Sequence, residues 1–235
     1  MKTIGMIGGM SWESSVEYYR VLNTRTRERL GGLHSAACIL FSVDFAAIEA
    51  LQRRGDWAAA TRVMVAAAQA VAGAGAELLL ICTNTMHLMA DAVQAAVDIP
   101  LLHIADATAG RVLARRFTRI GLLGTRFTME KDFYRGRLAE KHGLEVLVPS
   151  AADRRMVDAV IFEELCRGRI LPASKAAYLR IIDDLLQAGA QGIILGCTEI
   201  GLLVTQADTG APLFDTARIH AEAAVDFAID GPSGG

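Results

Sequence analysis

The chain has 235 residues, of which 52% are hydrophobic and only 6% are aromatic. Ala, Leu, Ile and Val therefore supply the apolar content, and the length is sufficient to bury a core without disulfide bonds, which excludes collagen-like and disordered classes. Because 24 Lys and Arg residues are scattered among 26 Asp and Glu residues, the charge pattern argues against a nucleic-acid partner, and we expect a small-molecule partner.

Short aliphatic runs alternate along the chain with Ala-rich segments of helical spacing, a pattern typical of a parallel sheet covered by helices. We expect strands, in chain order, at about residues 3–7, 36–43, 77–82, 101–104, 119–123, 144–148, 192–196 and 212–214, with helices over most of the remainder. Glycine breaks the N-terminal apolar run after a few residues, so the run is too short for a signal peptide or a membrane span. The pattern predicts an α/β fold and no membrane partner.

An internal repeat is the most informative feature of the sequence. Residues 74–83 align without a gap with residues 188–197, an offset of 114. The offset is 116 for the upstream blocks 4–8 and 120–124, and 112 for the downstream blocks 100–102 and 212–214. Three blocks in the same order predict two copies of one α/β unit. Ligands of parallel sheets bind beyond the carboxyl ends of the strands, so we expect a cleft between the two units.

Four cysteines lack CxxC spacing and a matched histidine pair, so they indicate neither a zinc site nor a thioredoxin-type motif; reduced thiols of this kind are typical of the cytoplasm. Cys197 is a functional candidate rather than a buried apolar residue, because glycine precedes it at a strand end and a helix start there would lower the thiol pKa. Thr83 occupies the equivalent position in the first half. Side-chain alternation along the strand places Cys82 in the core, and we expect packing roles for Cys38 and Cys166.

Polar groups at the predicted strand ends are candidates to bind a ligand. Thr83, Asn84 and Thr85 offer two hydroxyls and a carboxamide, which suit either a ligand carboxylate or ammonium group or a helix N-cap. The glycine-rich turn at residues 8–12 lacks the spacing of a nucleotide-binding loop. We expect the isolated His87 and His103 to have structural or supporting roles. Arginines can clamp a carboxylate bidentately, although most are simply solvated; the candidates are Arg53, Arg54 and Arg126.

Three motifs together resemble the aspartate/glutamate racemase family, the cofactor-independent amino-acid racemases, over essentially the whole chain. They are Ile7-Gly8-Gly9-Met10-Ser11-Trp12, Thr83-Asn84-Thr85-Met86-His87 and Gly196-Cys197-Thr198-Glu199-Ile200. The resemblance implies two pseudo-symmetric α/β domains with the active site between them. Because the C-terminal segment of the family returns to the first domain, residues 1–104 plus 215–235 would form one domain and residues 105–214 the other. A homodimer without pyridoxal phosphate, metal or another cofactor is also implied.

The sequence departs from the family pattern at two positions. The family carries a cysteine before Asn-Thr in the first half and another before Thr-Glu in the second, whereas this chain has Thr83 and Cys197. It resembles the branch of broader amino-acid racemases in which threonine replaces one thiol, with aspartate and glutamate as the expected substrates. The second departure is Cys166, near which aspartate-specific relatives tend to carry a lysine for the distal carboxylate.

The resemblance implies interconversion of L- and D-aspartate or glutamate by two-base proton transfer at the α-carbon. One group must remove a proton from one face and another must deliver a proton to the opposite face, because a single base would restore the original configuration. In the family pattern, Cys197 serves the L face, and Thr83 is left to serve the D face. Donors on the substrate carboxylates would stabilise the carbanion; the expected binding residues are Met10, Ser11, Gln52, Asn84, Thr85 and Thr198.

Three alternative functions remain open at the level of sequence. A single active cysteine is also the pattern of decarboxylases in the same superfamily, which would release carbon dioxide from a malonate. A non-catalytic binder of acidic amino acids would not promote exchange of the α-hydrogen. A Rossmann-type nucleotide enzyme would copurify with its cofactor, although the fingerprint for such a fold is missing.

Overall fold

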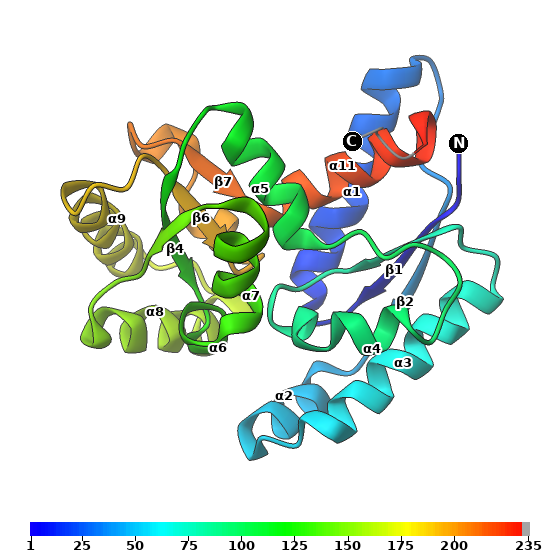
Figure 1. Cartoon of the computed structure of the whole chain (residues 1–235), viewed down its shortest axis with the longest axis horizontal. Helices are drawn as coiled ribbons and strands as arrows, with labels where there is room; N and C mark the ends of the chain where they lie inside the picture. The colour runs from blue at the N-terminus through cyan, green and yellow to red at the C-terminus, as the bar shows by residue number, and fades with distance from the viewer. Residues whose placement is uncertain (232–235) are drawn as a thin grey trace. The chain divides into compact units, whose positions relative to one another are not determined.

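A computed structural model describes residues 1–231, and the chain divides into two compact units (Figure 1). Unit 1 comprises Met1–Ile104 and the C-terminal segment from His220, and unit 2 comprises Ala105–Ile219. The chain passes from unit 1 to unit 2 after Ile104, the first crossing point, and returns to unit 1 after Ile219, the second crossing point. The family resemblance implies that residues 215–235 belong to the first domain, an earlier return than the one after Ile219; residues 232–235 fall outside the described part of the chain.

Unit 1 is built on a parallel sheet with the strand order β2-β1-β3. Its strands are β1 (Ile4–Gly8), β2 (Cys38–Ser42) and β3 (Leu78–Ile81). The prediction of a strand at residues 101–104 is wrong. Only Leu101 pairs with the sheet, through a single bridge to Leu79, and helix α5 already begins at Ile104. The helical segments of this part of the chain are α1 (Trp12–Leu30), α2 (Phe45–Arg54), α3 (Trp57–Gly73), η1 (Thr85–Met89) and α4 (Ala90–Gln94).

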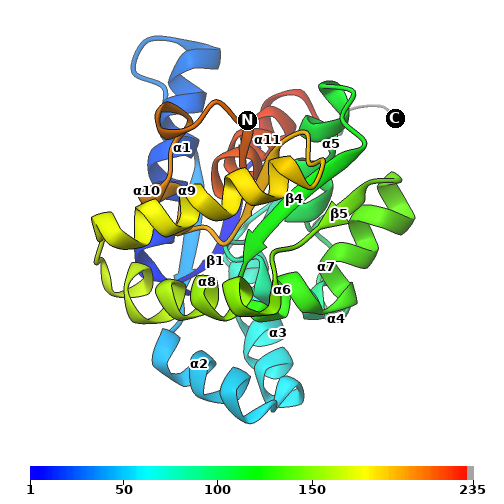
Figure 2. The ribbon, with the colours of Figure 1, turned by 90° about the vertical axis from the view of Figure 1, so that its left-hand side faces the viewer.

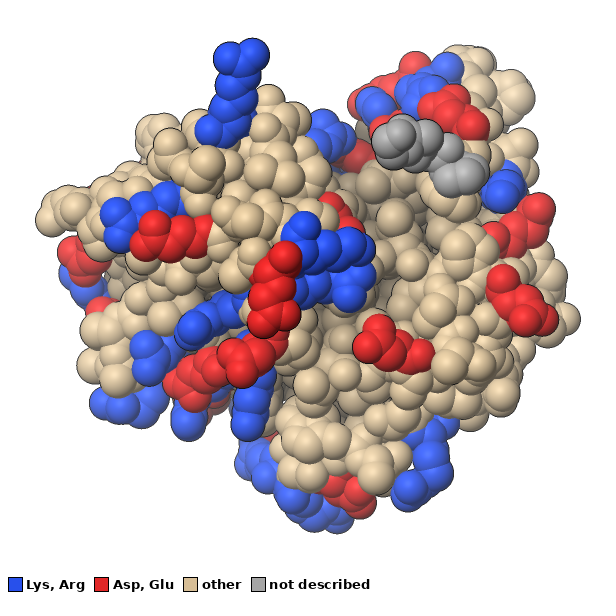
Figure 3. Space-filling view, in the orientation of Figure 1, with Lys and Arg blue, Asp and Glu red and all other residues tan. Residues whose placement is uncertain are grey.

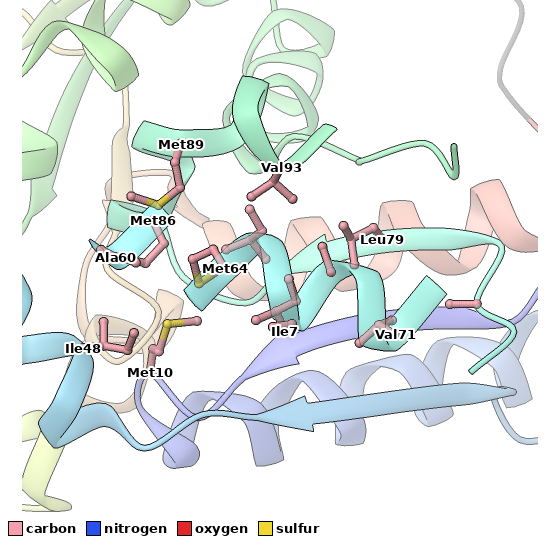
Figure 4. Close-up of a cluster of buried hydrophobic side chains, with 14 residues drawn as sticks. Ile7, Met10, Ile48, Ala60, Met64, Val71, Leu79, Met86, Met89 and Val93 are labelled. Atoms are coloured by element: carbon pink, nitrogen blue, oxygen red, sulfur yellow. The ribbon is translucent and has the colours of Figure 1, made fainter. Parts of the chain in front are cut away.

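Glycines on β1 allow helices to approach the sheet of unit 1 from both faces. A Cβ atom on Gly5 would lie 2.2 Å from Val71 Cγ1 of α3, and a Cβ atom on Gly8 would lie 2.5 Å from Ser15 Oγ of α1. Residues three apart on a strand point to opposite faces, so α3 and α1 cover opposite faces of the sheet. The core on the α3 face is a cluster of aliphatic and methionine side chains, to which Met10 belongs (Figure 4).

Unit 2 repeats this plan with four parallel strands in the order β5-β4-β6-β7. Helices α8 (Ala151–Glu163) and α9 (Pro172–Gln187) lie side by side and pack against β4 (Figures 1 and 2). The strands are β4 (Arg119–Gly124), β5 (Glu145–Leu147), β6 (Ile193–Gly196) and β7 (Leu213–Asp215). The shorter helical segments are α6 (Arg126–Glu130), α7 (Asp132–Gly136), η2 (Arg137–Lys141), η3 (Leu165–Arg167), α10 (Ile200–Leu203) and η4 (Gln206–Asp208).

The pairing register of the two sheets confirms the internal repeat. Across the sheet of unit 1, Gly5 pairs with Leu79, which in turn bridges to Leu101. The same row in unit 2 lies at offsets of 116, 114 and 112 residues, the three offsets found in the sequence; it consists of Gly121, Ile193 and Leu213. The two sheets are therefore equivalent residue by residue at their centres.

Each half of the repeat contributes its last helix to the other unit. Helix α5 (Ile104–Ala114) follows the Leu101 bridge of unit 1 but belongs to unit 2 from its second residue onward. Helix α11 (Thr216–Asp230) follows β7 of unit 2 but belongs to unit 1 from His220 onward. Carboxylate–guanidinium pairs attach these helices to the units that they join, Asp106 with Arg137 at 2.7 Å and Asp226 with Arg25 at 3.0 Å.

Membrane-spanning helices and clusters of metal-binding side chains are both absent from residues 1–231. No helix there is long and apolar enough to cross a membrane, and no group of three His, Cys, Asp or Glu side chains is placed to hold a metal ion. All four cysteines are free thiols. Basic and acidic side chains are interleaved on the face drawn in Figure 3, in keeping with the scattered charges of the sequence.

Candidate functional site

The loop after β1 is fixed in unit 1 by a glycine that has no room for a side chain. Gly9 has a φ of +87°, and a Cβ atom there would lie 2.3 Å from the carbonyl oxygen of Val43. Its N–H donates to Ser15 Oγ at 2.8 Å. The neighbouring β3 is parallel to β1, so the loops after both strands lie at the same edge of the sheet.

Cys82 and Thr83, the two adjacent residues in the loop after β3, differ in solvent exposure. Cys82 is completely buried, and burial raises the pKa of its thiol, so the core position expected from side-chain alternation is confirmed. Thr83 is only half-buried. Its carbonyl oxygen lies 2.8 Å from His87 Nδ1, which ties the loop to η1.

Polar side chains next to Thr83 are nearly buried and lie around the start of η1. Asn84 and Thr85 are 2% and 6% exposed. Asn84 occupies the N-cap position, but its side chain accepts no hydrogen bond from the helix, so the N-cap alternative is not supported. Gln52 of α2 is brought to the same place, because its Nε2 donates to Met86 Sδ at 3.2 Å.

The remaining candidate binding residues of unit 1 differ in whether their side chains can reach a ligand. Ser11 is buried at the N-cap position of α1, at the end of the loop after β1. The Met10 side chain lies in the hydrophobic cluster, so only its backbone remains for a polar ligand. Arg53 and Arg54 are exposed, and Arg53 pairs with Glu49 on its own helix at 2.6 Å. In unit 2, Arg126 pairs with Glu130 at 3.6 Å.

Unit 2 carries a thiol, a hydroxyl and a carboxylate directly after β6. Cys197 Sγ donates a hydrogen bond to Glu199 Oε2 at 2.8 Å, and Thr198 Oγ1 donates to the same oxygen at 2.9 Å. Glu199 is 1% exposed, and Cys197 and Thr198 are buried. A buried carboxylate is costly unless it is hydrogen-bonded, and these two donors meet that need.

The Cys197 thiol is held in its neutral form. Burial raises its pKa well above the ordinary value, and the negative charge of Glu199 raises it further. The expectation that a helix start lowers this pKa is wrong, because α10 has only four residues and desolvation outweighs any effect of its dipole. The group is therefore a protonated thiol with a carboxylate in place to accept its proton.

Two further side chains of unit 2 interact electrostatically with Cys197. Tyr178 of α9 is fully buried and donates to the Val157 carbonyl oxygen at 3.0 Å; burial and then the negative charge of a Cys197 thiolate raise its pKa. Cys166 lies on η3, and its electrostatic interaction with Cys197 contributes to the raised pKa of the Cys197 thiol. Sequence reasoning missed Glu199, although it stands inside a quoted motif, and Tyr178, for which the sequence offers no signal.

Thr83 and Cys197 are equivalent positions of the repeated unit. They are separated by 114 residues, as are Leu79 and Ile193, which occupy the same place in the two sheets. One half of the repeat therefore presents a hydroxyl where the other presents a thiol. Both groups can donate a proton, but a thiol ionises far more readily than an aliphatic hydroxyl.

Comparisons with known proteins converge on one family. The family profile Asp/Glu/Hydantoin racemase matches residues 7–224. A crystal structure of a candidate Asp/Glu racemase from Yersinia pestis is 55% identical, with a TM-score of 0.90, and the alignment covers 98% of this chain and 100% of that one. An aspartate racemase homologue from Pyrococcus horikoshii OT3 is 36% identical, with a TM-score of 0.84 and the same coverage of both chains.

More distant similarities add to this picture. A glutamate racemase from Parafrankia sp. is 33% identical over 145 residues, which are 60% of this chain and only 50% of that enzyme. An arylmalonate decarboxylase shares the fold with a TM-score of 0.53 at 14% identity. At that identity the likeness concerns the fold alone.

Proposed function

The chain belongs to the Asp/Glu/hydantoin racemase family, and we propose that it interconverts the L- and D-forms of aspartate and glutamate by two-base proton transfer at the α-carbon. The observation that carries the proposal is the thiol–carboxylate pair of Cys197 and Glu199, 2.8 Å apart at the end of β6. A racemase needs a group that can both take and return a proton, and this pair supplies one.

Cys197 acts on the L face in this proposal. Its proton passes to Glu199, and the resulting thiolate removes the α-proton of the L-isomer, so that an S–H bond forms while the Cα–H bond breaks. The electron pair of that bond remains on the α-carbon and is delocalised into the α-carboxylate. The raised pKa of the thiol makes the thiolate a strong base once it is formed.

Thr83 acts on the D face. Its hydroxyl delivers a proton to the α-carbon from the side opposite to the thiol. Water then returns a proton to the threonine oxygen, and Glu199 releases its proton to the hydroxide that remains, which restores the starting state. A hydroxyl donates a proton but is a poor base. When the D-isomer is the substrate, Thr83 must remove the α-proton, so this step is slower than removal of the α-proton of the L-isomer by Cys197. The half-buried position of Thr83 supports this assignment over the fully buried Cys82.

Donors around the two groups would bind the substrate carboxylates. In unit 1 we assign this binding role to Asn84, Thr85 and the loop that ends at Ser11. Gln52 would contact the side-chain carboxylate of the substrate. Thr198 would turn its hydroxyl from Glu199 to the substrate, and Met10 would contribute through its backbone. Donors on the α-carboxylate stabilise the carbanion because charge accumulates there in the transition state. The proposal therefore assigns no role to a cofactor or metal.

The alternative functions gain no support from these observations. The fold is shared with an arylmalonate decarboxylase, but at 14% identity that likeness says nothing about the reaction. A binder without catalysis would have no use for a buried carboxylate beside the thiol. The family match over residues 7–224 favours a racemase over a nucleotide enzyme.

Two matched serine variants test the proposal. Cys197→Ser keeps the shape of the side chain but removes the accessible anion, so racemisation of aspartate and glutamate should fall by roughly 10²–10⁴-fold. Cys82→Ser replaces a buried thiol that takes no part and should leave activity largely intact. If Cys197→Ser kept more than about a tenth of the activity, the acid–base assignment would be wrong. A folded but inactive Cys82→Ser would move the function to the other thiol.

We further propose that the protein forms a homodimer through the outer face of α1. Val16 and Tyr19 are exposed there, Leu33 in the following loop is fully exposed, and the three line a groove of about 520 Å³. Exposed apolar surface beside a groove is typical of protein–protein contacts. Light scattering should report a dimer for wild type and a monomer for Tyr19→Glu, with Val63→Glu on α3 as the control. A monomeric wild type would contradict this assignment.

A further inference from the structure

Three histidines of unit 1 form a buried cluster that the proposed reaction does not use. His87, His103 and His220 are at most 7% exposed. The rings of His87 and His103 are 4.5 Å apart, and those of His87 and His220 are 5.9 Å apart. Tyr18 packs edge-on against His220 at 5.7 Å. Residues from α1, η1 and α11 and from the segment before α5 therefore meet at one place.

The hydrogen bonds of His87 define a single neutral form of its ring. The backbone N–H of Ile104 donates to Nε2 at 3.2 Å, so Nε2 carries no proton. The proton must then be on Nδ1, which donates to the carbonyl oxygen of Thr83 at 2.8 Å. The ring thus connects the backbone of Thr83 to the last residue of unit 1 before the chain crosses to unit 2.

His220, at the second crossing point, has the opposite tautomer from His87, with its proton on Nε2. Its Nε2 donates to the Leu102 carbonyl oxygen at 2.8 Å, and its Nδ1 accepts from the Tyr18 hydroxyl at 2.8 Å. His220 is the first residue of unit 1 after the chain returns. Neither of these bonds reaches the Thr83 loop, so His87 and His220 have separable roles within one cluster.

We infer that His87 is a positioning residue for Thr83, whose backbone it anchors to Ile104 at the first crossing point. The inference rests on the proposed function, in which Thr83 delivers a proton to the D face. Thr83 lies in a loop followed by a five-residue 3₁₀ segment, so a long helix does not hold it in place. The imidazole supplies the missing restraint through the Thr83 carbonyl group. Proton transfer depends steeply on the placement of the donor.

Amide variants separate the two hydrogen bonds of His87. The carboxamide of His87→Asn matches the position of Nδ1 and can still donate to Thr83, whereas that of His87→Gln extends to the position of Nε2 and can serve Ile104. Both variants lose the ring packing with His103 and His220, so any general loss of stability is common to the two. Each variant keeps one of the two bonds, so a fall of the ratio in His87→Gln that is absent from His87→Asn assigns the effect to the bond with Thr83.

The readout is the ratio of inversion to α-hydrogen exchange for L-aspartate in deuterium oxide. Exchange needs Cys197 alone, whereas inversion also needs Thr83. We expect His87→Gln to lower the ratio by about tenfold or more and His87→Asn to keep it near the wild-type value. His220→Gln, which retains a donor and an acceptor at the second crossing point, should leave the ratio unchanged whatever its effect on thermal stability.

Two results would overturn the inference. One is a fall of exchange and inversion by the same factor in His87→Gln, which would mark a purely structural role; the other is an equal fall of the ratio in both amide variants. NMR of the imidazole nitrogens in the wild-type protein tests the geometry without any variant, because an Nε2–H tautomer would contradict it. If Cys197→Ser retained activity, the proposed function would fail instead, and the wild-type tautomer would still stand.

Discussion

The Cys197 thiol and the Glu199 carboxylate, both buried in unit 2, are joined by a hydrogen bond of 2.8 Å. The carboxylate accepts from the neutral thiol and opposes its ionisation. In the proposed reaction, the thiol proton passes to Glu199 through this same contact. The pair therefore holds the thiol neutral before the proposed proton transfer.

Replacing Glu199 by glutamine should lower the pKa of the Cys197 thiol. Burial raises that pKa most and would remain, but the negative charge of Glu199 and its acceptance of the thiol proton would be lost. The pH titration of thiolate absorbance, taken as the difference between each protein and its Cys197→Ser counterpart, reports the shift directly. Turnover should fall even so, because the proton acceptor is missing. An unchanged titration would show that the two groups do not interact.

Asn84→Ala should reduce kcat/KM for aspartate by about 10²-fold, the effect of removing one donor from a site of developing negative charge. Both binding and turnover should suffer, because the same carboxylate is bound in the ground state and gains charge in the transition state. Gln94→Ala is a suitable control. Its amide serves only backbone groups, among them the Ile99 carbonyl oxygen at 3.0 Å and the Leu101 N–H at 2.7 Å. An unaltered kcat/KM for Asn84→Ala would remove this residue from the site.

The fold was largely accessible from the sequence because its core is repetitive. The row of Gly5, Leu79 and Leu101 recurs in unit 2 at the three offsets of the repeat, and Gly75 and Gly189 share a φ of +98° at the offset of 114. Aliphatic runs and glycines are local signals, so alignment of the chain with itself detects them. The strand expected beyond Leu101 was lost to a helix that begins only three residues later.

The chemistry of the site was less accessible because it depends on tertiary contacts and burial. A strand-end position suggested a lowered pKa for Cys197, yet desolvation raises it, and burial cannot be measured from a strand boundary. Tyr18 and His220 are separated by 202 residues and meet at 2.8 Å. No spacing rule links such a pair, so the histidine cluster could emerge only from the structure.

The close approach of β4 and β6 predicts a strong effect of one methyl group. A Cβ atom on Gly124 would lie 2.8 Å from the carbonyl oxygen of Gly196, and a backbone atom cannot move aside as a side chain can. Gly124→Ala should therefore lower the free energy of unfolding by about 1–3 kcal/mol. Gly110→Ala in helix α5 meets nothing within 4 Å and should raise it by about 0.5–1 kcal/mol. Urea denaturation of both variants checks the contrast; equal effects would contradict the strand geometry.

His220 should make the stability of unit 1 depend on pH. Burial lowers its pKa from 6.5 to about 4, so between these values the unfolded chain binds a proton that the folded chain does not. The free energy of unfolding should fall as the pH is lowered from 6.5 to 4, by about 3 kcal/mol from this group. Above pH 6.5 the contribution is constant. His220→Gln should flatten the curve in this window, which denaturation at a series of pH values measures; parallel curves would contradict the neutral buried state.

In the proposed reaction, Cys197 and Thr83 act on opposite faces of the α-carbon with unequal competence. Enantiomers have equal free energy in water, so kcat/KM must be equal in the two directions, and the asymmetry can appear only in kcat and KM separately or in exchange without inversion. The most direct measurement follows L-aspartate and L-glutamate in deuterium oxide, with α-deuterium and chirality recorded together. We expect deuterium to enter the L-isomer faster than the D-isomer forms, and Thr83→Cys to raise inversion relative to exchange. Exchange that never outruns inversion, in wild type and variant alike, would contradict this expectation.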